Sequence, residues 1–176
     1  MPLTTVDGFK TDGFVALADD APLPEAGGAI VSLERFRRDR DPLVARNAPI
    51  GVKLRSDQSP ERLGEDIHRL SLVALEFPKF RDGRAFSWAR LLRSRLGFTG
   101  EIRAVGDFLY DQVAYQRRVG FDAWELPDGF TGEAFQRALT EITEVYQPSA
   151  DGRRTIANMR DDRASETGTR AFLNGG

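Results

Sequence analysis

The chain has 176 residues, of which 40% are hydrophobic and 30% charged, as is typical of one soluble globular domain. Its 25 basic and 27 acidic side chains nearly balance, so no overall charge favours nucleic acid or an anionic membrane. Cysteine is absent and histidine occurs once, as His68. These counts exclude disulfides, thiolate nucleophiles, iron–sulfur ligation and histidine-rich or cysteine-based metal sites. We expect no metal site.

The first residues, MPLTTVDGFK, contain neither the basic nor the apolar stretch of a signal peptide. No run of about 18 apolar residues, the length that spans a bilayer, occurs in the sequence. We therefore expect a cytoplasmic protein that does not enter the membrane.

The segment 7–36 is predicted to be a small N-terminal β segment. Within it, Asp12-Gly13 is a dipeptide typical of a hairpin turn and lies between Phe9-Lys10 and the apolar stretch 14–17. A further strand is expected at 29–33. The charged segment 34–48 is expected to hold a short helix that starts at Asp41-Pro42.

From residue 50 the pattern alternates between strands and helices. Strands are expected at 50–54, 72–77, 101–105 and 121–126. Helices are expected after Ser59-Pro60, over 85–96, from Asp107 to Gly120 and after Thr131, with Ser59, Asp107 and Thr131 as N-caps. Four consecutive strand–helix units predict an α/β fold whose parallel strands form either an open sheet or a partial barrel.

The predicted domain spans residues 1–147. After it, residues 148–176 are rich in small, polar and mixed-charge side chains and poor in large apolar ones. This composition predicts a flexible C-terminal tail.

Charged residues occur inside the predicted strands, where parallel strands are usually apolar. They are Lys53, Glu76, Arg103 and Glu125. In one interpretation they form the floor of a ligand pocket, with Lys53 and Arg103 binding the ligand and Glu76 and Glu125 as candidate catalytic bases. In the other they form a structural ion network or touch water at strand ends, because a buried charge costs several kcal/mol unless it is paired.

The stretch FPKFRDGR, residues 77–84, follows a predicted strand and precedes a predicted helix. Ligands of α/β proteins bind beyond the carboxyl ends of the strands, and a helix N-terminus favours anions. Lys79 and Arg84 are therefore candidate ligands of an anion, and Asp107, at the next strand-to-helix turn, is a third candidate at this edge. The alternative is that Asp82 caps the helix and the arginines stay in solvent.

The predicted helix continues this basic run. Arg81, Arg90 and Arg93 are candidate contacts for an acidic protein partner. A nucleic-acid surface would need exposed aromatic residues for stacking, whereas Trp88 lies on the apolar stripe of the helix. No phosphate-binding or nucleophile-elbow motif occurs, and no cofactor is identified.

The string FPKFRDGRAFSWARLLRSRLGFTGEIRAVGDFLYDQVAYQRRVGFDAWEL, residues 77–126, resembles the signature block of an uncharacterised bacterial family labelled as oxidoreductases of sulfite reduction and encoded beside assimilatory sulfite reductase. The resemblance is strongest over residues 71–126, looser over 28–70 and absent from 148–176. The matching stretches are FPKF at 77–80, DGR at 82–84, ARLLR at 89–93, Arg103-Ala104, Gly106-Asp107 and Gly120-Phe121-Asp122.

The resemblance implies a role in sulfite reduction. Because the chain lacks the usual ligands of iron–sulfur clusters and haem-type iron, we expect an accessory protein that delivers, assembles or regulates sulfite reductase, with residues 79–95 as its contact surface. An enzyme that binds an anionic substrate at the carboxyl ends of the strands is the alternative. A flavin or nicotinamide oxidoreductase ranks third.

Overall fold

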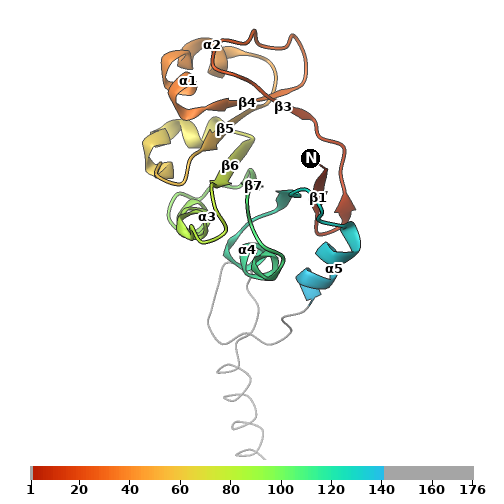
Figure 1. Ribbon diagram of the computed structural model, residues 1–176. Coiled ribbons are helices and arrows are strands. Elements are labelled where there is room, and N and C mark those ends of the chain that lie inside the picture. Colours follow the sequence, from red (N-terminus) through yellow and green to blue (C-terminus); the bar gives the residue numbers. More distant parts are fainter. Residues whose placement is uncertain (1, 141–176) are drawn as a thin grey trace, which may run out of the picture.

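The computed structural model describes residues 2–140, and its centre is an eight-stranded sheet of order β2-β1-β8-β7-β6-β5-β4-β3 (Figure 1). The strands are β1 (Leu3–Thr5), β2 (Gly8–Phe9), β3 (Phe14–Ala16), β4 (Gly28–Ser32), β5 (Ile50–Leu54), β6 (Leu72–Phe77), β7 (Glu101–Gly106) and β8 (Ala123–Glu125). Strands β3 to β8 run parallel. Strand β1 runs antiparallel to β8, and β2 antiparallel to β1. The sheet curls into a half-barrel.

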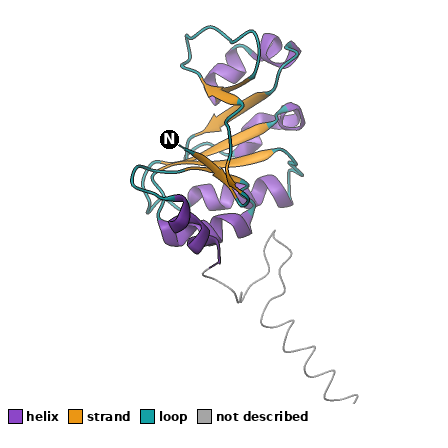
Figure 2. Ribbon diagram, turned by 90° about the vertical axis from the view of Figure 1, so that its right-hand side faces the viewer, coloured by secondary structure: helices purple, strands orange, loops and turns teal. Residues whose placement is uncertain are grey.

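The helices lie along the outer side of this curled sheet, as Figures 1 and 2 show. They are α1 (Leu33–Arg38), α2 (Arg40–Ala45), η1 (Pro60–Arg69), α3 (Arg84–Ser94), η2 (Tyr110–Gln112), α4 (Val113–Val119) and α5 (Gly132–Thr140), where η marks a 3-10 helix. Most of them connect one parallel strand to the next.

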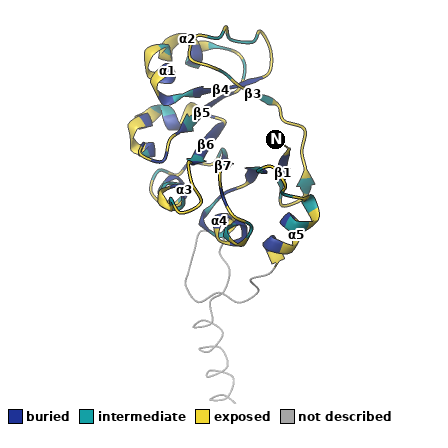
Figure 3. Ribbon diagram, in the orientation of Figure 1, coloured by how far each residue is buried: buried dark blue, intermediate teal, exposed yellow. Residues whose placement is uncertain are grey.

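Each parallel strand has one side toward the helices and one toward the inner side of the half-barrel. The outer-side residues Val52, Leu75 and Ala104 are fully buried in the main hydrophobic core with the helices. Burying a valine or leucine side chain in this way contributes about 1.5–3 kcal/mol. The inner side has a small second cluster that includes Ile30 and Leu72. Figure 3 shows the sheet largely buried and the outer surfaces of the helices exposed.

The α/β class and the mainly parallel sheet are confirmed, and the four strands predicted after residue 50 correspond to β5, β6, β7 and β8. The parallel sheet is larger than predicted, because β3 and β4 extend it and β1 and β2 add an antiparallel edge. The hairpin predicted at Asp12-Gly13 is wrong. Strands β2 and β3 lie at opposite ends of the sheet, since β3 pairs parallel with β4.

The predicted helix starts have mixed outcomes. The hydroxyl of Ser59 accepts a hydrogen bond from the backbone N–H of Glu61, and that of Thr131 accepts one from Ala134, so these caps are confirmed. Asp107 is not the cap, because the helical turns begin only at Tyr110 and Leu109 holds the N-cap position. Between residues 34 and 48 there are two short helices, α1 and α2. The predicted tail 148–176 lies outside the described residues.

Candidate functional site

The four charged residues predicted inside the parallel strands form two separate groups on the inner side of the sheet. The Lys53 ammonium lies 2.6 Å from a Glu76 carboxylate oxygen on the neighbouring strand. Arg103, one strand further, lies 3.3 Å from the Glu125 carboxylate. The two interpretations of these charges therefore apply to different residues: Arg103 belongs to an ion network, whereas Lys53 and Glu76 line a cavity.

Arg103 is the centre of that network. Its side chain is only 1% exposed and contacts the carboxylates of Asp12, Glu101 and Glu125. Burial favours the neutral form, but the hydrogen bonds to Asp12 and the charge of Glu101 raise the pKa of Arg103 above its ordinary value. The guanidinium is also stacked over the Phe14 ring at 5.8 Å. Since this charge is already compensated within the domain, the predicted ligand-binding role of Arg103 has no support from its geometry.

Residues 10–13, the link between β2 and β3, cross the inner side of the half-barrel from one edge of the sheet to the other (Figure 1). We call this segment the strap. The Lys10 ammonium lies 3.1 Å from Glu101, and the Asp12 carboxylate accepts two hydrogen bonds from Arg103. These ionic contacts hold the strap over β7.

A cavity of about 230 Å³ opens at the carboxyl ends of β3, β4, β5 and β6, where ligands of parallel α/β folds bind. We call it the carboxyl-edge cavity. Its polar lining consists of Ser32, Glu34, Lys53, Arg55, Gln58 and Glu76. Its apolar lining consists of Ala16, Leu17, Ile30 and Val31. The sequence predicted Lys53 and Glu76 here but missed the other polar residues.

Glu34, Arg55 and Gln58 form a second polar group in this cavity. One Glu34 oxygen accepts hydrogen bonds from the Arg55 guanidinium at 3.0 Å and from the Gln58 amide at 2.8 Å. The Gln58 oxygen accepts from the backbone N–H of Arg55 at 2.8 Å. A sequence signal existed, because Arg55 directly follows β5 and Glu34 lies two residues after β4. Only the pairing of β4 with β5 places them together.

The loop before α3 holds the residues predicted to bind an anion. The Asp82 carboxylate accepts hydrogen bonds from both the backbone N–H and the guanidinium of Arg84, and these bonds lower the pKa of Asp82 well below its ordinary range. Arg84 also donates to the Ser56 hydroxyl at 2.9 Å. The chain's own carboxylate thus occupies this helix start. Lys79 is exposed, and neither Lys79, Arg84 nor Asp107 lines the carboxyl-edge cavity.

The arginines predicted to contact a partner differ in their surroundings. Arg93 donates to the carbonyls of Phe98, Gly100 and Gly120 and pairs with Asp122, so it ties α3 to the segments that flank β7. Arg81 and Arg90 are exposed. A partner could therefore reach the side chains of Arg81 and Arg90, whereas the guanidinium of Arg93 is hydrogen-bonded within the domain.

Exposed aromatic side chains lie beside these arginines. Phe80 and Tyr115 are 36% and 45% exposed, and the Arg81 guanidinium lies 5.3 Å from the centre of the Phe80 ring. The Tyr115 ring lies 5.2 Å from that of Phe86 on α3. Gln112 joins the two loops, because its amide donates to the Phe80 carbonyl and accepts from the N–H of Leu109, which is 40% exposed.

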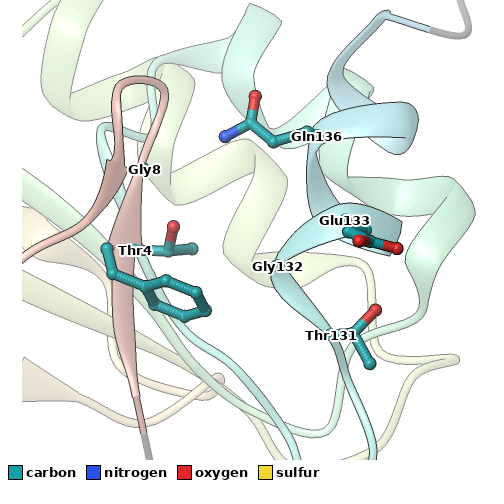
Figure 4. A pocket seen from close by; sticks show the side chains of 7 residues that line it. Thr4, Gly8, Thr131, Gly132, Glu133 and Gln136 are labelled. Atoms are coloured by element: carbon teal, nitrogen blue, oxygen red, sulfur yellow. The ribbon is translucent and has the colours of Figure 1, made fainter.

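A larger cavity of about 640 Å³ lies between the β1–β2 hairpin and α5. Figure 4 shows Thr4 on its strand side and Glu133 and Gln136 on its helix side. Among the described residues that line it, Glu133 is the one with an ionisable side chain. It therefore lacks the paired charges of the carboxyl-edge cavity.

Within residues 2–140, no helix has the length and apolar character needed to cross a membrane. The same residues contain no group of three or more histidine, cysteine, aspartate or glutamate side chains suited to hold a metal ion.

A family model described as "Bacterial protein of unknown function (DUF934)" matches residues 51–157. The match begins at β5 and extends beyond residue 147, so it reaches further toward the C-terminus than the resemblance did. No significant match was found among curated proteins or among solved structures.

Proposed function

Because the chain belongs to the bacterial family DUF934, and because its residues 77–126 resemble a block associated with sulfite reduction, we propose that it is an accessory protein of assimilatory sulfite reduction. In this proposal it docks on an acidic surface of sulfite reductase or of another protein of that process. It delivers, assembles or regulates the partner.

The observation that supports docking is a set of exposed aromatic, apolar and basic side chains on the loop before α3, on α3 and on the segment from Leu109 to α4, two loops that Gln112 joins. We call it the basic–aromatic surface; its members are Lys79, Phe80, Arg81, Arg90, Leu109 and Tyr115. Arg90 lies one helical turn after Phe86, whose ring contacts Tyr115. Aromatic residues and arginine are enriched in the energetically important parts of interfaces.

The charge of this surface indicates the chemistry of the partner. Its three charged members, Lys79, Arg81 and Arg90, are cationic, although the exposed Asp107 and Asp111 lie in the adjoining loop and the chain as a whole has a net charge of −2. Complementary charge speeds association and selects an acidic partner. The aromatic side chains would supply the apolar contact area at the centre of the interface.

The amino-acid composition supports an accessory role over one that carries electrons on iron. Iron–sulfur clusters and haem-type iron are bound mainly through cysteine and histidine. The chain has no cysteine and only His68, so it cannot supply a full ligand set of this kind.

The test is affinity purification of the tagged protein from sulfate-grown bacteria that encode it, with the recovered proteins identified by mass spectrometry. The variant is the double substitution Arg81→Glu, Arg90→Glu. The matched control, Arg69→Glu, Arg137→Glu, makes the same change of charge at exposed positions of η1 and α5.

We expect sulfite reductase to be recovered with the wild type and the control and lost with the variant. Recovery of no sulfite-assimilation protein with the wild type would contradict the proposal. Equal recovery of sulfite reductase with the wild type and with the variant would show that it does not bind at the basic–aromatic surface.

A further inference from the structure

We propose that the carboxyl-edge cavity binds a small zwitterion with the chemistry of a free α-amino acid. This ligand site is separate from the basic–aromatic surface, shares no residue with it, and does not depend on the proposed docking function.

The balance of charge in the cavity is the first argument. Two cations, Lys53 and Arg55, and two anions, Glu34 and Glu76, line it. They form two adjacent ion pairs, with distances of 2.6 Å between Lys53 and Glu76 and 3.0 Å between Arg55 and Glu34. A ligand with an ammonium and a carboxylate can meet one partner of each sign. A simple anion would be attracted by the cations but repelled by both carboxylates.

The accessibility of these side chains is the second argument. The Lys53 side chain is 44% exposed and that of Glu34 is 51% exposed, so a ligand can reach both. Strand β4 is hydrogen-bonded to β5, and β5 to β6. Lys53 and Glu76 lie on β5 and β6, and Glu34 lies at the start of α1, directly after β4. All three residues therefore belong to one hydrogen-bonded edge of the sheet. The backbone positions that carry these charges are therefore fixed relative to one another, while the side chains remain accessible.

The third argument is that a buried side chain orients this group. Gln58 is only 1% exposed. Its amide donates to Glu34 and its oxygen accepts from the N–H of Arg55. One side chain thereby holds the carboxylate in place and closes the turn after β5. Binding sites in which such support fixes the contacting groups lose less conformational entropy when the ligand binds.

The apolar wall and the volume define the size of the ligand. Leu17 and Ile30 line the cavity beside the charged groups. Its volume of about 230 Å³ lies just below the range of about 300–1,000 Å³ that is typical of sites for drug-sized ligands. An amino acid with a small branched aliphatic side chain matches this combination of charge, apolar surface and size.

The test uses L-valine as the probe, together with its two truncated analogues. Isobutylamine is valine without the carboxylate, and isovalerate is valine without the ammonium group. Binding of each is measured on the full chain by NMR titration of backbone amides. We expect saturable shifts with L-valine in residues 30–34 and 53–58, and at least about tenfold weaker binding of each analogue, as expected when one ionic contact is lost.

The variants are Lys53→Gln and Glu34→Gln, which each remove one charge from a half-exposed side chain. The amide oxygen introduced by Glu34→Gln can still accept hydrogen bonds from Arg55 and Gln58. The matched control is Lys10→Gln, because Lys10 is 52% exposed and is paired with a carboxylate outside the cavity. We expect each cavity variant to bind L-valine about tenfold more weakly and the control to bind as the wild type does.

The proposal is overturned if L-valine causes no saturable shifts up to millimolar concentration. It is also overturned if isovalerate binds as tightly as L-valine, which would make the cavity an anion site. Equal binding by the wild type and both cavity variants would place the probe elsewhere and would exclude these ion pairs as its ligands.

Discussion

Asp12 and Arg103 are 91 residues apart in the chain, yet the Asp12 carboxylate accepts two hydrogen bonds from the Arg103 guanidinium, at 2.7 and 3.0 Å. This two-pronged arrangement is the strong form of an arginine–carboxylate pair. It joins the strap to the centre of β7 and covers the inner side of the half-barrel. A charge that would be costly inside a parallel sheet is thereby compensated by a residue from the N-terminal segment.

Removing the charge of Asp12 should destabilise the domain. Arg103 is almost completely buried but keeps Glu101 and Glu125 as partners, so we expect Asp12→Asn to lower the free energy of unfolding by about 1–3 kcal/mol. Urea denaturation measures this change. The control is Asp57→Asn, whose carboxylate is 60% exposed beside Arg55 and should change the stability by less than about 0.5 kcal/mol. Equal stability of Asp12→Asn and the wild type would contradict the role assigned to the strap.

The same pair should make stability depend on pH. Burial alone would raise the pKa of Asp12, but hydrogen bonds from Arg103 and from the N–H of Phe14 lower it below the ordinary value. A carboxylate whose pKa is lower in the folded state stabilises the fold above the unfolded-state pKa of about 3.9, and this contribution disappears as the pH falls through the folded-state pKa.

The stability difference between the wild type and Asp12→Asn should therefore be largest near neutral pH and shrink as the pH falls below about 4. Urea denaturation of both proteins over a pH series measures it. A difference that stays constant over the acidic range, or grows there, would show that the Asp12 pKa is not lowered by folding.

Arg93 should be needed for stability, because its guanidinium bonds to three backbone carbonyls and to Asp122. The side chain is only 19% exposed. We expect Arg93→Ala to lower the free energy of unfolding by about 2–4 kcal/mol, since part-buried acceptors lose their donor. Arg90→Ala, at an exposed position of the same helix, should cost less than about 0.5 kcal/mol. Denaturation curves of the two variants that coincide would overturn this expectation.

Gly106, at the end of β7, should tolerate no side chain. Its φ angle is +97°, and an added Cβ would lie 2.4 Å from the Phe77 carbonyl oxygen. We expect Gly106→Ala to lower the midpoint of thermal unfolding strongly and to lower the free energy of unfolding by more than about 2 kcal/mol. Gly97→Ala is the control, because Gly97 has φ +61° with open space around it. This variant should lower the free energy of unfolding by only about 1 kcal/mol. If Gly106→Ala and Gly97→Ala unfold at the same midpoint temperature, the predicted clash is contradicted.

Much of the fold could be predicted because its signals are local. The apolar runs of β5 and β6 and the cap residues Ser59 and Thr131 depend on near neighbours in the chain. The same reasoning failed at Asp12-Gly13. A turn dipeptide favours a hairpin only if the flanking strands pair, and here β2 and β3 each pair with other strands.

The candidate site was predictable only in part. Lys53 and Glu76 were identified because charges are unusual inside parallel strands. Glu34, Arg55 and Gln58 were missed because charged and polar residues in loops are common and usually solvated. Their significance comes from the register of β4 against β5, which no local pattern contains.

The sequence by itself therefore determined strands β4 to β8, the caps at Ser59 and Thr131 and the mainly parallel α/β class, because periodicity and capping act over a few residues. It also predicted the carboxyl edge of the sheet as the place for a site. Only the tertiary structure decided which charges meet. It placed Arg103 with Asp12 in a closed ion network and left Lys53 and Glu76 in an open cavity. The physical reason is that a charge takes its role from the partners and solvent around it, and these come from segments far apart in the chain.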